Sequence, residues 1–192
     1  MMVAIAVMIG SFRDTVVYWV GQTLKADLFI GPGIRPTVGS VQTVSEDVIA
    51  TLAAHPQVEA LDRFRNVDLI FNGNLAVLGG GSFDVVVDYG GLVFKSPENA
   101  REVVRGSIGQ DVVIISEPFA TRYKKRDGET IDIPTPQGVK PFRIVATYYD
   151  YASDRGVVIM DRGTFRKYFG ELPPTGVAAY LKPGADPEKV RS

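Results

Sequence analysis

The sequence contains no cysteine, and its single histidine is His55. The lack of cysteine excludes disulfides, thiolate nucleophiles and cysteine-based zinc or iron–sulfur sites. It is compatible with a bacterial extracytoplasmic location, where free thiols are a liability, but it does not establish one. One histidine builds neither a histidine-rich metal site nor a familiar catalytic triad. Because His55 precedes Pro56 at the end of a predicted helix, we interpret it as a structural residue of that helix end.

The sequence also lacks an excess of charge of either sign. Its formal net charge is −1 over 192 residues. This balance argues against nucleic acid as a partner, because phosphate binding needs a clustered basic excess. The one dense basic cluster, RYKKRDG at 122–128, is partly neutralised by Asp127 and Glu129. We interpret this cluster as the solvated end of a helix rather than as an anion-binding site.

No apolar run is long enough to cross a bilayer, which takes about 20 residues. The nearly uncharged segment Met1–Gly10 instead continues into a helical pattern. No Lys or Arg precedes it and no cleavage site follows it, so we reject a cleaved signal peptide. We predict that residues 1–26 contain the outer end of a transmembrane helix followed by a stalk helix. The apolar face of that helix consists of Phe12, Val16, Trp19, Val20 and Leu24.

Nucleotide-binding and nucleophile motifs are absent too. The sequence GGGS at 79–82 is not followed by the Gly-Lys-Ser/Thr of a phosphate loop, and its surroundings do not fit a dinucleotide fingerprint. No G-x-S-x-G nucleophile elbow occurs. We therefore expect no cofactor, and we interpret Gly79–Ser82 as a loop or bulge within a β-rich region.

Hydrophobic periodicity predicts a succession of short strands and helices. The pair Asn72-Gly73 predicts a tight β-hairpin. Ser96, Ser116 and Asp161 stand where helices are expected to start, and Thr43 with Glu46 has capping-box spacing. Strands are predicted at 26–30, 58–71, 75–78, 83–91, 110–116, 129–134, 139–149, 156–160 and 175–183, and helices at 45–55, 97–106, 117–126 and 162–170. A further helix is predicted to begin at Asp186, so the chain starts and ends within helices and we expect an excised domain.

Carboxylates form one group of candidate site residues. Asp84 and Asp88 are predicted to share one face of a strand, and Asp150 and Asp154 flank a loop. This spacing is not that of an EF-hand. Solvated turn and edge residues fit the pattern better than paired-carboxylate hydrolysis or calcium binding, but both alternatives stay open.

Tyrosines form the other group. The loop YYDYASDRG places Tyr148, Tyr149 and Tyr151 around Asp150. Tyrosine clusters favour interfaces, because each side chain supplies apolar area and a polar tip. Alternate tyrosines at a strand end also pack on a core. The sequence does not decide between a partner-binding loop and a core contribution.

Ordered features along about 180 residues resemble the extracytoplasmic domain of FtsX-like and MacB-type ABC transporter permeases. VAIAVMIGSFRDTVVYWVGQTLKADLFIGPG resembles the end of a transmembrane helix, its stalk and the first periplasmic strand. HPQVEALDRFR resembles the helix-to-strand passage that follows. DVVIISEPFATRYKKRDGETIDIPTPQGVKPFRIVATYYDY is similar to the family's order of strand, helix, strand and returning hairpin. Glu129 stands where the family often has an aspartate.

The resemblance implies an α+β fold for an extracytoplasmic domain of residues 27–192. An α/β porter-like lobe, at about 27–70 and 176–192, is expected to be interrupted by a β-rich sabre-like lobe at about 71–175. The N-terminal stalk helix precedes both lobes. The resemblance also implies that residues beyond Ser192 complete a second strand-helix-strand unit and return to the membrane.

The resemblance further implies a role without catalysis. ATP is then hydrolysed by a cytoplasmic ABC ATPase subunit or domain, and this domain, at the outer face of the bacterial inner membrane, moves in response. The stalk acts as a lever between the two. The implied partners are the membrane, a second permease copy, and a cargo or periplasmic partner protein. The direction of transport and the cargo, whether lipid, lipoprotein, peptide or drug, stay open.

Two alternatives belong to other functional classes. A regulatory permease would use its β-rich lobe to dock and activate a cell-wall hydrolase, with the tyrosine loop as the docking surface. A soluble hydrolase would use a carboxylate pair drawn from Asp84, Asp88, Glu117 and Asp150. Carboxylates that converge in a deep pocket would favour the hydrolase, whereas scattered and exposed carboxylates would remove it.

Overall fold

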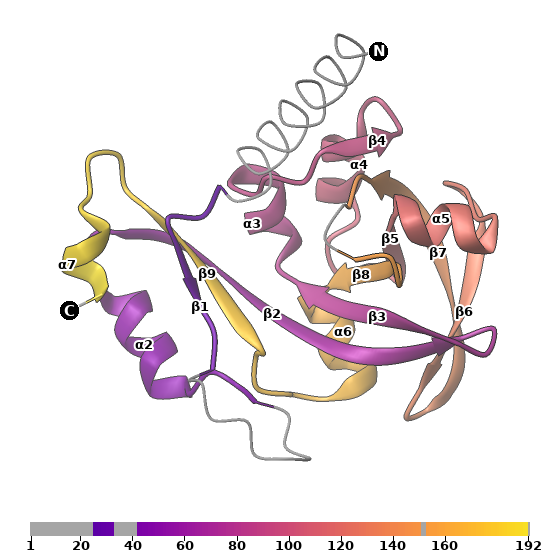
Figure 1. The fold of residues 1–192 in the computed structure, drawn as a ribbon, viewed down its shortest axis with the longest axis horizontal. Coiled ribbons are helices and arrows are strands. Elements are labelled where there is room, and N and C mark those ends of the chain that lie inside the picture. Colours follow the sequence, from indigo (N-terminus) through magenta and orange to yellow (C-terminus); the bar gives the residue numbers. More distant parts are fainter. Residues whose placement is uncertain (1–24, 33–41, 151–152, 192) are drawn as a thin grey trace, which may run out of the picture.

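The computed structural model describes residues 25–32, 42–150 and 153–191 (Figure 1). The predicted membrane and stalk segment, with Phe12, Val16, Trp19, Val20 and Leu24, lies outside the described residues, as does Tyr151. Within the described part of the chain, none of the helices has the length and apolar character needed to span a membrane.

The described elements alternate between strands and short helices. The strands are β1 (Leu28–Ile30), β2 (Val58–Phe71), β3 (Asn74–Gly81), β4 (Phe94–Ser96), β5 (Val112–Ser116), β6 (Thr130–Thr135), β7 (Gly138–Tyr148), β8 (Val157–Asp161) and β9 (Gly176–Leu181). The helices are α2 (Glu46–Ala54), α3 (Phe83–Asp88), α4 (Ala100–Gly106), α5 (Glu117–Tyr123), α6 (Arg162–Phe169) and α7 (Pro187–Arg191).

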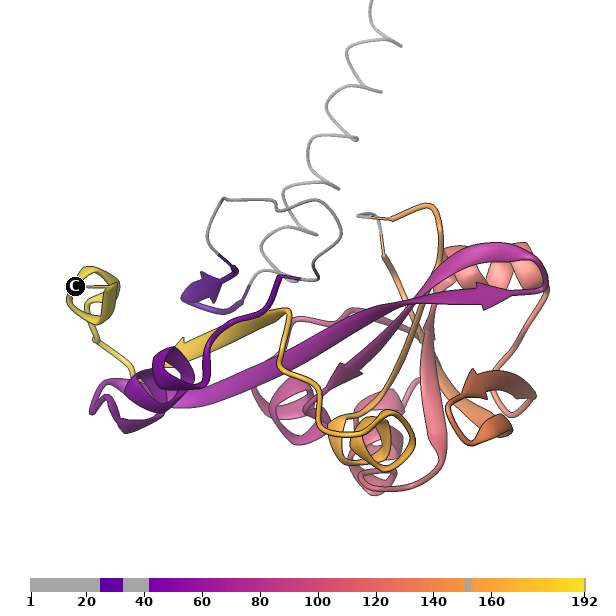
Figure 2. The ribbon, with the colours of Figure 1, turned by 90° about the horizontal axis from the view of Figure 1, so that it is seen from below.

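All described strands belong to one mixed sheet of nine strands. Its order is β1-β9-β2-β3-β8-β5-β7-β4, with β6 paired to β7. The strands β3 and β8 run parallel, as do β5 and β7, whereas the other pairs are antiparallel. Figure 2 shows β2 running across the width of the molecule, with α2 and α7 near one end and α5 near the other. The predicted α+β fold is therefore confirmed.

Local sequence signals account for several connections. Asn72 and Gly73 adopt φ values of 48° and 77°, the left-handed pair that a two-residue hairpin between β2 and β3 requires. Ser116 caps α5, because its Oγ accepts a hydrogen bond from the Phe119 N–H at 3.4 Å. Asp161 caps α6 by accepting from the Gly163 N–H at 3.0 Å. These three predictions are confirmed.

The predicted strand at 83–91 is wrong, because residues 83–88 form helix α3. The β-branched run Val85–Val87 favours a strand. In the structure, however, the chain leaves the sheet after Gly81, and burial follows a helical period. Phe83 and Val87 are buried, whereas Asp84 and Asp88 between and beside them are exposed.

Two predicted caps and one predicted loop are also corrected. Ser96 lies in β4, and Asn99 takes the cap position of α4. Ser45, not Thr43, occupies the cap position of α2, without a side-chain cap hydrogen bond. The glycines of Gly79–Ser82 belong to β3 rather than to a loop, because the residues from Gly79 to Gly81 pair with β8.

The core lies on both faces of the wider part of the sheet. On one face, Phe119 of α5 and Phe165 of α6 pack on residues of β2, β3 and the β5–β8 region. On the other face, Phe83 of α3 and Val104 of α4 pack on Ile114, Ala146 and Tyr148. A smaller cluster around Ile49 of α2 and Val177 covers the part formed by β1, β9 and the first half of β2.

Candidate functional site at the junction of the two sheet halves

Strand β2 is shared by two halves of the sheet. Its residues 58–64 pair with β9, and its residues 65–71 pair with β3. The strands β9 and β3 lie on opposite sides of β2. Along β2, the paired strand therefore changes from β9 to β3 between Phe64 and Arg65. We call this place the junction. Among the described strands, only β2 pairs with members of both halves.

Glycines face β2 on both sides of the junction. Gly176 pairs with Phe64, and a Cβ at position 176 would stand 2.7 Å from Cε2 of the Phe64 ring. Gly80 pairs with Arg65, and a Cβ there would stand 2.6 Å from Cγ of Phe165. Real Cβ atoms do not approach neighbours so closely. Each glycine therefore makes room for an aromatic ring that packs directly on the backbone.

Thr175 forms hydrogen bonds to β2 at the junction. Its backbone N–H donates to the Phe64 carbonyl oxygen at 3.0 Å. Its hydroxyl oxygen accepts from the Asn66 N–H at 3.0 Å. Nearby, Nη1 of Arg65 donates to the Pro173 carbonyl oxygen at 2.9 Å. Side chains thus satisfy backbone groups of β2 where the ladder passes from one partner to the other.

Asp62 connects the two halves through a hydrogen bond. It lies on the part of β2 that pairs with β9, and its Oδ1 accepts from the Ser82 N–H at 2.9 Å, just beyond the end of β3. Burial raises the pKa of Asp62 from 3.8 to about 6; the Ser82 hydrogen bonds oppose this shift, whereas neighbouring Asp84 adds to it. Asp62 also affects Tyr180 of β9. Burial of the Tyr180 hydroxyl, together with the negative charges of Asp62 and Asp27, raises the pKa of Tyr180 to about 12.

Asp161 fixes two helices to the end of β8. Its side chain is buried, and Oδ1 accepts from the Phe83 N–H at 3.3 Å while Oδ2 accepts from the Gly163 N–H at 3.0 Å. A carboxylate at a helix N-terminus satisfies free N–H groups and complements the helix dipole. The starts of α3 and α6 are therefore held together on the half of the sheet that contains β8.

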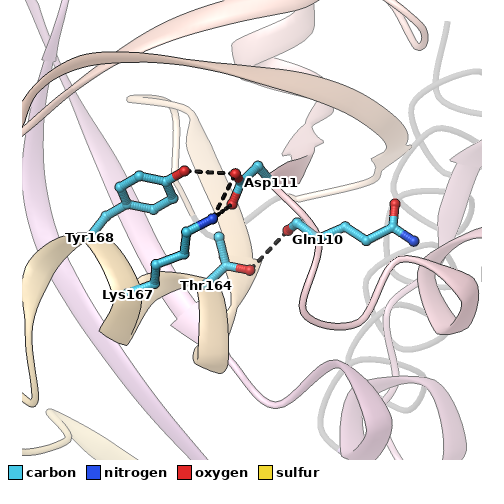
Figure 3. Close-up of polar contacts among 5 residues, drawn as sticks. All are labelled: Gln110, Asp111, Thr164, Lys167 and Tyr168. Atoms are coloured by element: carbon cyan, nitrogen blue, oxygen red, sulfur yellow. Dashed lines mark hydrogen bonds and ion pairs between the residues drawn. The ribbon is translucent and has the colours of Figure 1, made fainter.

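A second cluster attaches α6 to the start of β5 (Figure 3). Nζ of Lys167 lies 2.8 Å from Oδ2 of Asp111, and the Tyr168 hydroxyl donates to the same oxygen at 2.7 Å. The Thr164 hydroxyl donates to the Gln110 carbonyl oxygen at 2.8 Å. Burial acts to raise the pKa of Asp111, but the hydrogen bonds from Lys167 and Tyr168 outweigh it and hold that pKa below its usual value. We interpret this cluster as structural.

The structure separates the tyrosines of the predicted partner-binding loop. Tyr148 is 5 % exposed and belongs to the core beneath α3 and α4, where burial raises its pKa well above the usual value. Tyr149 is half-buried; its N–H donates to the Val93 carbonyl oxygen, and Nζ of Lys95 lies 5.7 Å from its ring centroid. The side chain of Tyr148 is therefore not available to a partner.

The carboxylates of the hydrolase interpretation do not share a cleft. Asp88 pairs with Arg105, and Glu117 pairs with Lys95 at 3.1 Å, with side chains that are partly exposed to solvent. None of the three clefts described below is lined by Asp84, Asp88, Glu117 or Asp150. Within the described part of the chain, no group of three or more histidines and carboxylates is arranged to hold a metal ion.

His55 has the structural role expected for it. It is the C-terminal cap of α2, and its Nδ1 accepts a hydrogen bond from the Gln57 N–H at 3.2 Å.

Three of the clefts at the surface of the described residues are relevant to function. The first, of about 470 Å³, lies between β4, α5 and the turn after α5. The second, of about 440 Å³, runs along β1, α2 and α7, where Phe29 is 54 % exposed. The third, of about 340 Å³, lies beside the tip of the β2–β3 hairpin and β6. The first differs from the others in being lined by three cationic side chains, those of Lys95, Lys125 and Arg126.

Two solved structures have the same fold. The periplasmic region of MacB from Actinobacillus actinomycetemcomitans superimposes with a TM-score of 0.57 at 14 % identity, covering 85 % of this chain and 77 % of that one. The extracellular domain of the noncanonic ABC-type transporter YknZ from Gram-positive bacteria gives a TM-score of 0.55 at 11 % identity, covering 84 % and 86 %. At these identities the likeness concerns the fold alone.

Sequence comparison identifies the family. The chain is 28 % identical over 202 aligned positions to the uncharacterized ABC transporter permease protein Rv0987 of Mycobacterium tuberculosis (strain ATCC 25618 / H37Rv). That alignment covers 97 % of this chain and 22 % of the relative, so the chain spans about a fifth of the relative's length. The family described as MacB-like periplasmic core domain matches residues 1–192. The protein therefore belongs to the family of MacB-like periplasmic core domains.

Proposed function

We propose that this chain is the extracytoplasmic domain of an ABC transporter permease at the outer face of the bacterial inner membrane. In this role it couples ATP hydrolysis by a cytoplasmic ATPase to the movement or export of a lipid, lipoprotein, peptide or drug. The domain itself transmits motion and catalyses no reaction. The family match and the permease relative support the setting.

The junction is the observation that carries the coupling role. One strand of 14 residues, β2, belongs to both halves of the sheet. A displacement applied to the β1–β9 half therefore reaches the β3–β8 half through the covalent backbone of β2 and through the hydrogen bonds of Asp62 and Thr175. Rigid-body rotation about such a connection is an established way to transmit a conformational change.

The stalk completes this proposal at the membrane side. Phe12, Val16, Trp19, Val20 and Leu24 would form the face that packs on a neighbouring helix or lobe. The two halves of the sheet would be the bodies that move; they correspond approximately to the lobes expected at about 27–70 with 176–192 and at about 71–175, but they meet between Phe64 and Arg65. A second permease copy in the membrane would supply a symmetric partner.

The regulatory alternative, a domain that docks a cell-wall hydrolase, loses part of its basis. It rested on three tyrosines of one loop, and Tyr148 is buried in the core. We therefore put forward the transport role alone.

The test uses the full-length permease with its ATPase in lipid nanodiscs. This domain has no cysteine, so once any cysteines elsewhere in the permease and the ATPase are replaced, spin labels can be attached to cysteines introduced at chosen sites of the domain. One pair joins Phe29 on β1 to Val139 on β7, which are 54 % and 63 % exposed and lie in different halves of the sheet. A control pair, Ile108 and Val139, lies within one half. Pulsed electron paramagnetic resonance then measures both distances with and without ATP.

We expect ATP binding to change the distance between positions 29 and 139 while the control distance stays constant. The double variant Trp19→Ala/Val20→Ala is expected to abolish that change and to leave basal ATP hydrolysis measurable. An unchanged distance between positions 29 and 139 on ATP binding would refute the coupling role.

A further inference from the structure

The first cleft has the features of an anion site. Lys95 enters it from β4, Lys125 and Arg126 enter it from the turn that follows α5, and Thr147 of β7 also lines it. Figure 1 shows β4 and α5 in the same region of the fold, and an ion pair between Lys95 and Glu117 joins them. We propose that this cleft binds the phosphate group of a larger phosphorylated molecule. The inference does not depend on the coupling role proposed above.

The turn after α5 brings two of the cations into the cleft. Lys124 caps α5 in the left-handed conformation, with φ 52°, which reverses the chain and ends the helix. The backbone N–H of Arg126 donates to Oε2 of Glu129 at 3.0 Å, which fixes the turn. The basic cluster therefore does not simply extend α5 into solvent, because two of its members line a cavity.

The charges of the lining are not balanced. Three cationic side chains face one carboxylate, that of Asp127, and this carboxylate accepts a hydrogen bond from the Thr147 hydroxyl at 2.7 Å. Nζ of Lys95 forms an ion pair with Oε1 of Glu117 at 3.1 Å. Within the described part of the chain, Lys125 and Arg126 have no carboxylate within ion-pair distance, although Nζ of Lys125 donates to the Thr130 carbonyl oxygen at 3.3 Å. The cleft therefore retains two cations that a ligand can neutralise.

The donor set fits a phosphate better than a carboxylate. Arg126, Lys95 and Lys125 line the same cavity as Ser96 and Thr121, two residues that carry hydroxyl groups. A phosphate offers several acceptor oxygens in a tetrahedral arrangement, and Arg and Lys are its usual ligands. A carboxylate has two oxygens and would leave more of these donors without a partner.

The size of the cleft indicates a ligand larger than inorganic phosphate. Its volume is about 470 Å³, within the range of pockets that hold small organic molecules. A lipid headgroup and a soluble phosphorylated molecule share this chemistry.

The experiment measures binding to the full-length permease. One arm titrates glycerol 3-phosphate, with acetate as the carboxylate comparison, by isothermal titration calorimetry in phosphatidylcholine nanodiscs. The other arm detects phosphatidylglycerol retained by the detergent-solubilised permease in native mass spectrometry. The test variant is Lys125→Gln/Arg126→Gln. The matched control is Lys140→Gln/Arg143→Gln, which removes the same charge from β7 at residues that do not line the cleft.

We expect Lys125→Gln/Arg126→Gln to bind the phosphorylated probe at least about tenfold more weakly than the wild type, because hydrogen bonds to charged groups are lost. The control Lys140→Gln/Arg143→Gln is expected to bind the probe as the wild type does. Asp127→Asn, which removes the one carboxylate of the lining, is expected to bind more tightly. A merely unfolded variant would not show this opposite sign. Binding of the soluble probe alone identifies a soluble ligand, and binding of the lipid alone identifies a headgroup.

Three results would overturn the proposal. These are the absence of binding in both arms, tighter binding of acetate than of glycerol 3-phosphate, and an equal loss of affinity in the test and control variants.

Discussion

The ring of Phe64 lies over Gly176, its partner across the β2–β9 ladder, in space that a side chain at position 176 would need. This contact stands one residue before the point where β2 changes partner from β9 to β3. Close packing of an aromatic ring on a glycine leaves little room for sliding, because protein interiors are packed at the density of organic crystals. The contact therefore fixes the register of β2 against β9 at the edge of the junction.

The first prediction concerns Gly176→Ala. The added methyl group meets the Phe64 ring, so we expect the free energy of unfolding to fall by about 1–3 kcal/mol, the usual cost of overpacking. Urea denaturation of the purified domain measures this change. The double variant Phe64→Leu/Gly176→Ala is expected to recover part of the loss.

Gly106→Ala serves as the control for this substitution. Gly106 is the last residue of α4, and a Cβ there meets no atom within 4 Å. We expect this variant to be as stable as the wild type or slightly more stable. If Gly176→Ala proved equally harmless, the close packing at the junction would be contradicted.

The second prediction concerns the pH dependence contributed by Asp62. Its pKa in the folded protein is raised from 3.8 to about 6, so between about pH 4 and pH 6 the folded state binds more protons than the unfolded state. The free energy of unfolding contributed by this group therefore falls as pH rises through that window, and it stays low above it. Asp62→Asn removes the ionisation while its side-chain oxygen still accepts from the Ser82 N–H.

We expect the stability of Asp62→Asn relative to the wild type to improve by about 1–3 kcal/mol between pH 4 and pH 7. Denaturation midpoints at four pH values across this range measure the trend. A difference between the two proteins that stays constant with pH would show that Asp62 titrates normally.

The third prediction has the opposite sign and concerns Asp111. Its pKa is lowered in the folded protein, so its contribution is present above its usual pKa and is lost as pH falls through the lowered value. We expect Asp111→Asn to reduce the free energy of unfolding by about 0.5–1 kcal/mol at pH 7, because the Lys167 pair is exposed to solvent. The difference should vanish in acid.

Asp132→Asn is the matched control for this substitution. Asp132 is an exposed residue of β6 that forms no ion pair among the described residues. The free energy of unfolding of Asp132→Asn should equal that of the wild type both at pH 7 and in acid. A loss of equal size in Asp132→Asn would mean that Asp111 acts through net charge rather than through Lys167 and Tyr168.

The sequence by itself determined those elements whose signals are local. The hairpin at Asn72-Gly73, the cap at Ser116 and the uniformly apolar strand that precedes it are confirmed. In each case the deciding interaction joins residues a few positions apart, or depends on the backbone preference of one residue. The α+β class follows from the order of such elements along the chain.

Only the tertiary structure decided the rest, because the deciding contacts join residues far apart in the chain. Residues 83–88 form a helix because their Phe83 N–H meets Asp161 and their apolar face meets the sheet. The glycines at 79–81 lie in a strand because they pair with β8, and Gly80 leaves the space that Phe165 fills. Likewise, the packing of β2 on β9 beside the junction depends on Phe64 meeting Gly176. The first cleft forms because the fold places Lys95 of β4 beside Lys125 and Arg126, which follow α5. A local pattern of residues carries no record of these distant partners.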